Sequence, residues 1–342
     1  MEEKKEILLS VKDLKVYYKV KAKSIIPKKE NVKAVDGISF DVYRKEAFGI
    51  VGESGCGKST LVNSIMGLQD PSETKITGEI DFEGQDLTKI SEADYNKIRG
   101  AKIGMIFQDP LSALNPLKRI EDQIEEVLIY HTDMSKQERR ARVLELLDQV
   151  GIVDPKRTAH QFPHQLSGGM RQRIVIAIAI ACKPDFIIAD EPTTALDVTI
   201  QAQILDLLKD IQKENHSSII LITHDLGVVA ETADYVHVMY AGKIVEKGNV
   251  DQVFNNPQHP YTRSLLKSIP QVDSESDELY VIEGSVPSLQ NMPATGDAFA
   301  PRIPWIPASD HEENPSMHKL GHGHEVRCTC YQDFYFKEES DA

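Results

Sequence analysis

The sequence predicts an α/β fold with a mainly parallel sheet, to which an antiparallel edge layer, a helical insertion and a C-terminal extension are added. An apolar strand at 47–51 runs into a glycine-rich loop and then into apolar residues at helical spacing. Apolar strands alternate with helices between residues 186 and 240, which is typical of a parallel sheet covered on both faces. Residues 271–342 are more acidic than the rest.

The edge layer is predicted from short apolar or alternating runs near the N-terminus. They are ILLSV from Ile7, VKAV from Val32 and ISFDV from Ile38. The lysine-rich segment SIIPKKEN lies between the first two runs, and we interpret it as a hairpin loop. An antiparallel layer is therefore expected before the strand at 47–51.

The helical insertion is expected at about 109–181, after a second buried strand, IGMIF, from Ile103. Ser135 and Glu138 have the spacing of a capping box, and Gly151 stands where the helix after them would end. The apolar face of this helix is predicted to comprise Val143, Leu146, Leu147 and Val150.

Three further strands are predicted at 186–189, 218–223 and 235–240. A helix between the first two is expected to have an apolar side formed by Ile200, Ile204, Leu207, Leu208 and Ile211. Beyond Pro270 the periodicity is weak, so we expect the well-formed core to end near that residue.

Length and composition favour a soluble chain of about two domains, because 342 residues exceed one average domain. The longest apolar run, Ile174 to Cys182, is far shorter than the roughly 20 residues that cross a bilayer. The first ten residues have mixed charges, unlike a secretory signal. Four scattered cysteines do not suggest a disulfide framework, so we expect the reducing cytosol.

The charge argues against nucleic acid as a partner, because proteins that bind a phosphate backbone need clustered positive charge. The net charge is −14. Residues 271–342 contribute −10 of it, with 14 acidic and 4 basic residues. The C-terminal extension is therefore a different kind of sequence from the first 270 residues.

The glycine-rich loop GESGCGKST fits the pattern G-x-x-x-x-G-K-[ST] of a loop that wraps a phosphate chain, between a strand and a helix. Backbone N–H groups and the helix N-terminus attract phosphates, Lys58 supplies a cation for the β- and γ-phosphates, and the Ser59 hydroxyl can ligate Mg²⁺. The motif comprises Gly52, Glu53, Ser54, Gly55, Cys56, Gly57, Lys58, Ser59 and Thr60.

Two further motifs support a nucleotide site. FIIADE at 186–191 ends a buried strand in two carboxylates, where Asp190 suits Mg²⁺ ligation and Glu191 suits a base for attacking water. LSGGM begins a helix with a hydroxyl and two glycine amides, a second anion-binding arrangement that would serve a nucleotide held by another subunit. It comprises Leu166, Ser167, Gly168, Gly169 and Met170.

The order of these motifs over residues 7 to about 270 resembles that of ATP-binding cassette (ABC) ATPases. In that family GESGCGKS is Walker A, LSGGM the signature and FIIADE Walker B, and the resemblance implies a P-loop ATPase core with ATP and Mg²⁺ as cofactors. It further implies that Gln108 senses Mg²⁺ and the attacking water, that His224 contacts the γ-phosphate, and that Asp197 of the D-loop acts across a dimer.

The resemblance also implies that Ser59, Gln108 and Asp190 form the Mg²⁺ site. An aromatic residue stacks on adenine just after the first strand in this family, which suggests Tyr18, and less so Tyr17. Lys45 departs from the family, because a glycine usually stands there, and we expect only a local change.

FNNPQHPYTRSLLKSIP at 254–270 and IEGSVPSL at 282–289 are similar to the ATPase subunits of dipeptide and oligopeptide importers. This resemblance implies an ABC ATPase domain at 1–270 and an extension at 271–342 that is typical of those importers. It also implies a second ABC ATPase, either a paralogue or a second copy, two membrane permeases and an extracytoplasmic solute-binding protein. The expected location is peripheral, on the cytoplasmic face of the plasma membrane.

Alternatives remain open at this point. Oligosaccharide importers belong to the same subfamily, so the same motor could serve another solute. A soluble ABC ATPase acting on DNA or ribosomes is disfavoured, because the chain lacks coiled-coil insertions, a second cassette and basic runs. An exporter is disfavoured by the importer-like tail, and a regulator without turnover by Glu191 and His224.

Many members of the peptide-importer subfamily carry four cysteines in this tail that can hold an iron–sulfur cluster. Here Asp297 and Ile303 occupy the first two cysteine positions, the third falls near Asp310, and only Cys328 matches, so no iron–sulfur cluster is expected. Cys330 could form a metal site with histidines, but a solvated His-rich loop with free thiols is favoured. These histidines are His318, His322 and His324.

Overall fold

A computed structural model describes residues 6–21, 29–269, 280–288, 291, 293 and 295–337. The chain divides into two compact units that each combine distant parts of the sequence. Unit 1 comprises Met1–Leu9, Asp41–Phe48 and Asp81–Thr223, and unit 2 comprises Ser10–Phe40, Gly49–Ile80 and His224–Ala342. Among the described residues, no helix is both long enough and apolar enough to span a membrane.

Unit 1 contains the predicted parallel strands. Strand β7 (Phe186–Asp190) pairs in parallel with β6 (Ile103–Ile106) and with β8 (Ser218–Thr223), and every residue of β7 and β8 is buried. The helix predicted to follow β7 is α8 (Val198–Asn215). Its buried residues are Ile204, Leu205, Leu208 and Ile211. The predicted residues Ile200 and Leu207 are only half-buried, whereas Leu205, which was not predicted, is buried.

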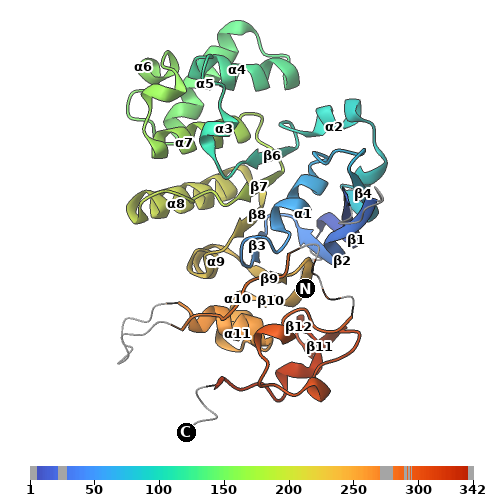
Figure 1. Cartoon of the computed structure of the whole chain (residues 1–342). Helices are drawn as coiled ribbons and strands as arrows, with labels where there is room; N and C mark the ends of the chain where they lie inside the picture. Colours follow the sequence, from blue (N-terminus) through green and yellow to red (C-terminus); the bar gives the residue numbers. More distant parts are fainter. Residues whose placement is uncertain are drawn as a thin grey trace, which may run out of the picture. The chain divides into compact units, whose positions relative to one another are not determined.

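The predicted helical insertion follows β6 within unit 1 (Figure 1). Its longest helix, α5 (Lys136–Gln149), has the predicted capping box, since Ser135 accepts from the Glu138 N–H and Glu138 reaches back to the Ser135 N–H. Gly151 has a φ of 75°, which suits its place just after this helix. The helices of the insertion are α3 (Pro110–Ala113), α4 (Ile120–His131), α5 (Lys136–Gln149), α6 (Pro155–Ala159) and α7 (Gly168–Ala179).

The edge layer is formed by β1 (Ile7–Lys21), β2 (Lys29–Tyr43) and β4 (Thr74–Phe82), with β1 between the other two. The two runs that begin at Val32 and Ile38 belong to one strand, β2. The short β5 (Gln85–Asp86) pairs with the end of β4. The loop predicted between the first two runs falls largely outside the described residues.

Strand β3 (Ala47–Val51) follows the turn that contains Lys45, and α2 (Glu92–Ile98) precedes β6. Lys45 has a φ of 64°, in the left-handed region that glycine adopts most easily. Its N–H donates to Ser218 Oγ at 2.8 Å, so this hydrogen bond supports the turn conformation. The departure from glycine is therefore accommodated locally, as expected.

The C-terminal part of unit 2 is an antiparallel sheet in the order β11-β12-β10-β9. The strands are β9 (Tyr235–Tyr240), β10 (Lys243–Asn249), β11 (Met317–Gly321) and β12 (His324–Arg327). The helices of this unit are α1 (Lys58–Ile65), α9 (Leu226–Thr232), α10 (Val250–Asn255) and α11 (Pro260–Lys267). The expectation that the well-formed core ends near Pro270 is therefore wrong, because β11 and β12 extend this sheet.

The prediction of a solvated His-rich loop is wrong for His324 and for the two cysteines, although both thiols are free as predicted. Cys328 and Cys330 are both 0% exposed. His324 is buried on β12, where its Nε2 lies 2.8 Å from Glu246 Oε1 of β10. His318 contacts Glu312 instead of Cys330. Burial of the histidine is possible because Glu246 provides a hydrogen-bond partner.

Candidate nucleotide-binding and hydrolysis site

The phosphate loop of unit 2 lies between β3 and α1, as predicted. Gly57 precedes α1 with a φ of 106°, and a Cβ on it would lie 2.5 Å from the Ala34 carbonyl oxygen. Gly52 is similarly confined by the Met239 carbonyl oxygen. Both ends of the loop therefore require glycine, whereas Ser54 and Gly55 at its centre are exposed. This shape leaves the middle of the loop accessible to a phosphate chain.

Lys58 is enclosed by the loop that precedes it. Its side chain is buried, and its Nζ donates to the carbonyl oxygens of Gly52 at 2.6 Å and Glu53 at 3.1 Å. Cys56 is buried beside it, and burial raises the pKa of that thiol. Ser59 is exposed on the first turn of α1. The loop thus combines a held cation with a helix N-terminus, a set of groups that suits a nucleotide phosphate chain and Mg²⁺.

The two tyrosines considered for adenine stacking make different contacts. The Tyr18 hydroxyl lies 3.2 Å from Thr60 Oγ1, the last residue of the loop motif, and donates to Gln69 Oε1 at 3.2 Å. Tyr17 donates to Asp36 Oδ1 at 2.6 Å. Tyr18 is therefore the tyrosine that contacts the loop motif directly.

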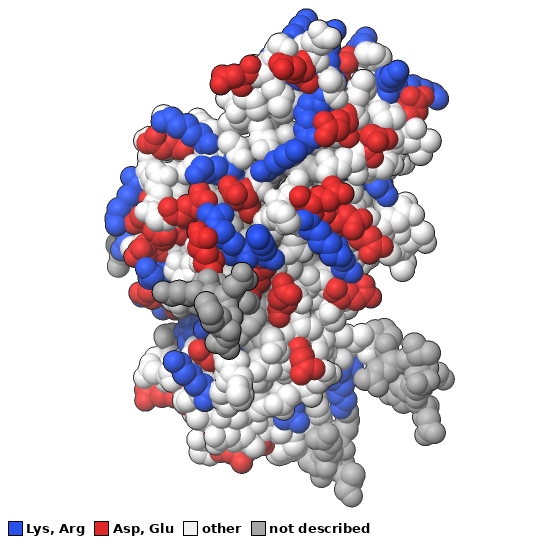
Figure 2. Space-filling model, turned by 180° about the vertical axis from the view of Figure 1, so that it is seen from behind, with Lys and Arg blue, Asp and Glu red and all other residues white. Residues whose placement is uncertain are grey.

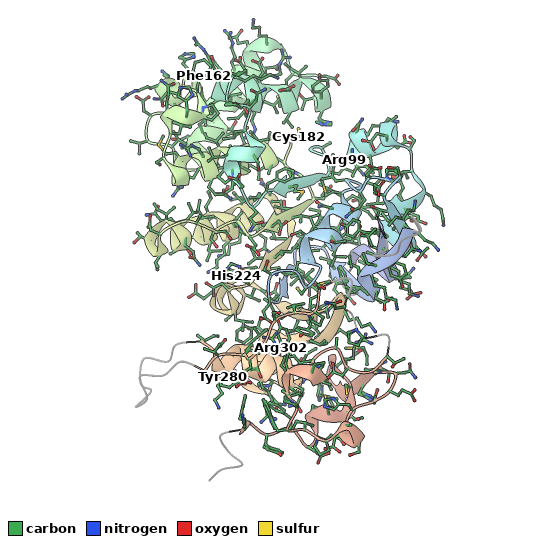
Figure 3. The ribbon with its side chains drawn as sticks, viewed as in Figure 1. Arg99, Phe162, Cys182, His224, Tyr280 and Arg302 are labelled. Carbon is green, nitrogen blue, oxygen red and sulfur yellow. The ribbon has the colours of Figure 1, made fainter. Side chains whose placement is uncertain are left out.

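Glu53 of the loop is held by two residues that the sequence did not single out. Its N–H donates to the Tyr261 hydroxyl at 2.8 Å, and its carboxylate accepts from Arg302 Nη1 at 2.6 Å and Nη2 at 3.3 Å. Arg302 (Figure 3) also donates to the carbonyl oxygens of Ile282 and Glu283. Burial lowers the pKa of Arg302, but the bonds to Glu53 outweigh it and raise that pKa overall.

An aromatic cluster places these two residues. Tyr261 of α11 packs against Tyr240 of β9 with ring centroids 4.6 Å apart, and Phe299 lies 5.4 Å from both rings. The Arg302 guanidinium lies 5.7 Å from the centre of the Phe299 ring. The C-terminal region thus contributes directly to the surroundings of the phosphate loop through contacts within unit 2.

In unit 1, Gln108 and Glu191 are brought together. Gln108 Nε2 donates to Glu191 Oε2 at 2.8 Å, and Thr194 Oγ1 donates to the same oxygen at 2.9 Å. The Glu191 backbone has a φ of 47° and its N–H donates to the Ile222 carbonyl oxygen of β8. Asp190, the last residue of β7, is 7% exposed. One carboxylate is thus buried at the strand end and the next is oriented by two donors.

The signature LSGGM begins α7 in unit 1. Leu166 is buried, and Ser167 caps the helix, accepting from the Met170 N–H at 3.3 Å. A Cβ on Gly169 would lie 2.9 Å from Ile200 Cγ2, and Gly168 faces Leu196 at a longer distance. Asp197 caps α8, where it accepts from the Ile200 N–H at 3.0 Å. The glycines therefore permit close packing of α7 against the start of α8.

The predicted residues are distributed over both units. Gln108, Asp190, Glu191, Asp197 and the signature lie in unit 1, whereas the phosphate loop, Tyr18 and His224 lie in unit 2. His224 is exposed (labelled in Figure 3) and directly precedes Asp225, which caps α9. Each unit therefore contains part of the predicted set.

Figure 2 shows that Lys and Arg are interspersed with Asp and Glu over the face drawn there.

Comparison with known proteins agrees with these motifs. Residues 35–194 match the model of the family described as ABC transporter, and residues 245–305 match that described as oligopeptide/dipeptide transporter, C-terminal region. The chain is 50% identical over 335 residues to the oligopeptide transport ATP-binding protein OppD of Lactococcus lactis subsp. cremoris. This match covers 98% of this chain and 97% of the relative. It is 56% identical over 274 residues to the dipeptide transport ATP-binding protein DppD of Bacillus subtilis, covering 80% and 82%.

Among solved structures, a dimeric post-hydrolysis state of the ATP-binding cassette MJ0796 bound to ADP and Pi is similar, with a TM-score of 0.62 and 32% identity. The match covers 71% of this chain and 98% of that one. The fold expected from the motifs, a P-loop ATPase core, is thereby confirmed. The chain belongs to the ABC transporter ATPases, in the family that contains the ATP-binding proteins of oligopeptide and dipeptide transporters.

Proposed function

We propose that the chain is the ATP-hydrolysing subunit of an importer that carries oligopeptides or dipeptides across the plasma membrane. The observation that supports this most strongly is the 50% identity to an oligopeptide transport ATP-binding protein over nearly the full length of both chains. The match at 245–305 to the C-terminal region of such transporters adds support from outside the ATPase motifs. In this proposal, residues 1–270 are the ATPase domain with a helical subdomain at about 109–181, and residues 271–342 are an extension.

The residues of the loop motif would hold the phosphates of ATP, with Tyr18 against the adenine. The confined glycines and the enclosed Lys58 support this assignment, because both favour a compact anion. Mg²⁺ would be held by Ser59, Gln108 and Asp190. When bound, Mg²⁺ neutralises charge on the phosphates.

Glu191 would act as the general base that activates the attacking water. The two hydrogen bonds from Gln108 and Thr194 to one carboxylate oxygen support this role, because they fix the orientation of the carboxylate. His224 would contact the γ-phosphate. Asp197 and the signature 166–170 would meet the ATP bound by a second subunit.

The proposed partners are a second ABC ATPase, either a paralogue or another copy of this chain, and two membrane permeases. An extracytoplasmic solute-binding protein would act indirectly, by delivering the solute to the permeases. The chain would therefore work at the cytoplasmic face of the membrane, and nucleic acid is not among its proposed partners. The names of the relatives, which are ATP-binding subunits of peptide transporters, support this arrangement.

The proposal is tested by reconstituting the chain with its permeases in liposomes and measuring ATP hydrolysis with the solute-binding protein inside. We expect peptide-loaded binding protein to stimulate hydrolysis and an oligosaccharide to have no effect. Glu191→Gln should abolish the stimulation, whereas Glu214→Gln, on the exposed side of α8, should retain it. Stimulation by oligosaccharides but not by peptides would show that the solute is wrong, and equal rates for both variants would show that the base is wrong.

A further inference from the structure

Four side chains of metal-ligand type converge in the C-terminal region of unit 2. Asp297, His311, Cys328 and Cys330 each offer one ligand atom, and these four atoms all lie within 4.8 Å of one another. Asp297 and His311 come from two different segments, and the cysteines follow β12. Folding therefore gathers three parts of the chain at one point.

Two of the distances between these atoms match those between the ligands of one tetrahedral ion. Bonds from Zn²⁺ to oxygen, nitrogen and sulfur are about 2.0–2.3 Å long, so neighbouring ligand atoms of a tetrahedron lie about 3.3–3.8 Å apart. Asp297 Oδ2 lies 3.6 Å from Cys330 Sγ and 3.6 Å from His311 Nδ1. The second distance is longer than an ordinary hydrogen bond between nitrogen and oxygen.

The cluster is buried, and its imidazole lacks a hydrogen-bond partner. Cys328 and Cys330 are fully buried, and the side chains of Asp297 and His311 are 5% and 8% exposed. Neither ring nitrogen of His311 has a hydrogen-bond partner. A buried polar group without a partner is destabilising, and a bond to a metal ion would supply that partner.

Backbone groups orient two of the four side chains from outside. The Phe299 N–H donates to Asp297 Oδ1 at 3.0 Å, which leaves Oδ2 toward the cluster. The Glu312 N–H donates to Cys328 Sγ at 3.5 Å. Hydrogen bonds of this kind fix the geometry of ligands in metal sites. Cys328 also adopts a φ of 68°, an uncommon conformation for a residue other than glycine.

We propose that Asp297, His311, Cys328 and Cys330 form a structural Zn²⁺ site. Two thiolates, an imidazole and a carboxylate are ligands that Zn²⁺ accepts, and four protein ligands leave no open position for substrate. Ca²⁺ and Mg²⁺ prefer oxygen ligands, and only one of the four is an oxygen. The bound ion would join the segments at 297, 311 and 328–330, and this role does not depend on the transported solute.

An iron–sulfur cluster fits these residues less well than Zn²⁺. Such clusters are held mainly by cysteine thiolates, and this group contains two. Ile303, at the second of the family's cysteine positions, is 1% exposed and has no ligand atom. The region therefore holds four side chains of metal-ligand type that differ from the four cysteines of the family.

The first experiment measures zinc, iron and acid-labile sulfide in the full-length protein, purified without chelators from zinc-supplemented cells. We expect equimolar zinc, little iron and no sulfide. Cys328→Ser and His311→Ala should each lower the zinc content at least tenfold. Two matched controls should keep it: Cys182→Ser, in unit 1 (Figure 3), and His322→Asn, at an exposed turn.

A second measurement uses the wild-type protein, so it does not depend on whether a variant folds. Zinc is replaced by Co²⁺, and we expect thiolate-to-cobalt charge transfer together with the intense visible bands of a tetrahedral site. Removal of the ion by a strong chelator should lower the midpoint of thermal unfolding. The proposal would be overturned by failure to bind Zn²⁺ or Co²⁺, by full zinc content in Cys328→Ser, or by equimolar iron with sulfide.

Discussion

Replacing Arg302 by alanine tests whether the C-terminal region stabilises the phosphate loop. The Arg302 side chain is 5% exposed and donates twice to the Glu53 carboxylate, which is 31% exposed. A hydrogen bond to a charged group contributes about 1.5–3 kcal/mol, and breaking a buried ion pair costs about 3–5 kcal/mol. Because water can reach Glu53 in the variant, we expect the lower end, a loss of about 3 kcal/mol.

That loss is measured by thermal and denaturant unfolding of the full chain. At roughly 2–4 °C per kcal/mol for a unit of this size, the midpoint should fall by about 6–12 °C. Arg302→Lys should lose about half as much, because a lysine keeps the charge but not the two-pronged geometry. Arg140→Ala, at an exposed position of α5, serves as the control and should change stability by less than about 0.5 kcal/mol. If Arg302→Ala behaved like this control, the ion pair would not stabilise the loop.

Three further predictions concern ATP. Glu191→Gln should keep ATP affinity but lower the hydrolysis rate about 100-fold or more, because an amide cannot accept the proton of water. A hydrolysis rate near that of the wild type would refute the role of Glu191 as the base. Lys58→Ala should weaken ATP binding roughly 10- to 100-fold in calorimetry, through loss of charge-assisted bonds, and an unchanged Kd would contradict the assignment. In ultracentrifugation, the Glu191→Gln variant should form dimers with ATP and Mg²⁺ but remain mainly monomeric without them. A stable dimer without nucleotide would mean that other contacts hold the subunits together.

The sequence predicted those features that depend on local patterns. The strand, loop and helix around Lys58 follow from an apolar run, glycines and helical spacing, and the capping box of Ser135 and Glu138 is formed as predicted. Parallel pairing of β6, β7 and β8 follows from their continuous apolar character. In each case the strands and helices are signalled within short stretches, where propensity and periodicity act.

Long-range contacts could not be predicted in this way. Arg302 and Glu53 are 249 positions apart, and Tyr261 and Glu53 are 208 positions apart, so no local pattern connects them. The HEVR segment of β12 alternates, but its buried positions hold His324 and Val326. A buried histidine becomes plausible only once Glu246 is known to face it. The group of four metal-ligand side chains was also not predicted, because its members lie far apart in the sequence. In addition, His311 stands next to Asp310, near which the third cysteine position of the family falls.

The pairing of β12 with β10 determines what happens at the edge of this sheet. If the chain were shortened before residue 317, the side of β10 opposite β9 would present unpaired N–H and C=O groups. Exposed edges of that kind promote strand addition between molecules and aggregation. In the intact chain the outer strand is instead β11, which is short and carries His318 and Lys319. The C-terminal strands therefore protect the protein against edge-to-edge association, and a shortened chain should lose solubility before any effect on transport could be measured.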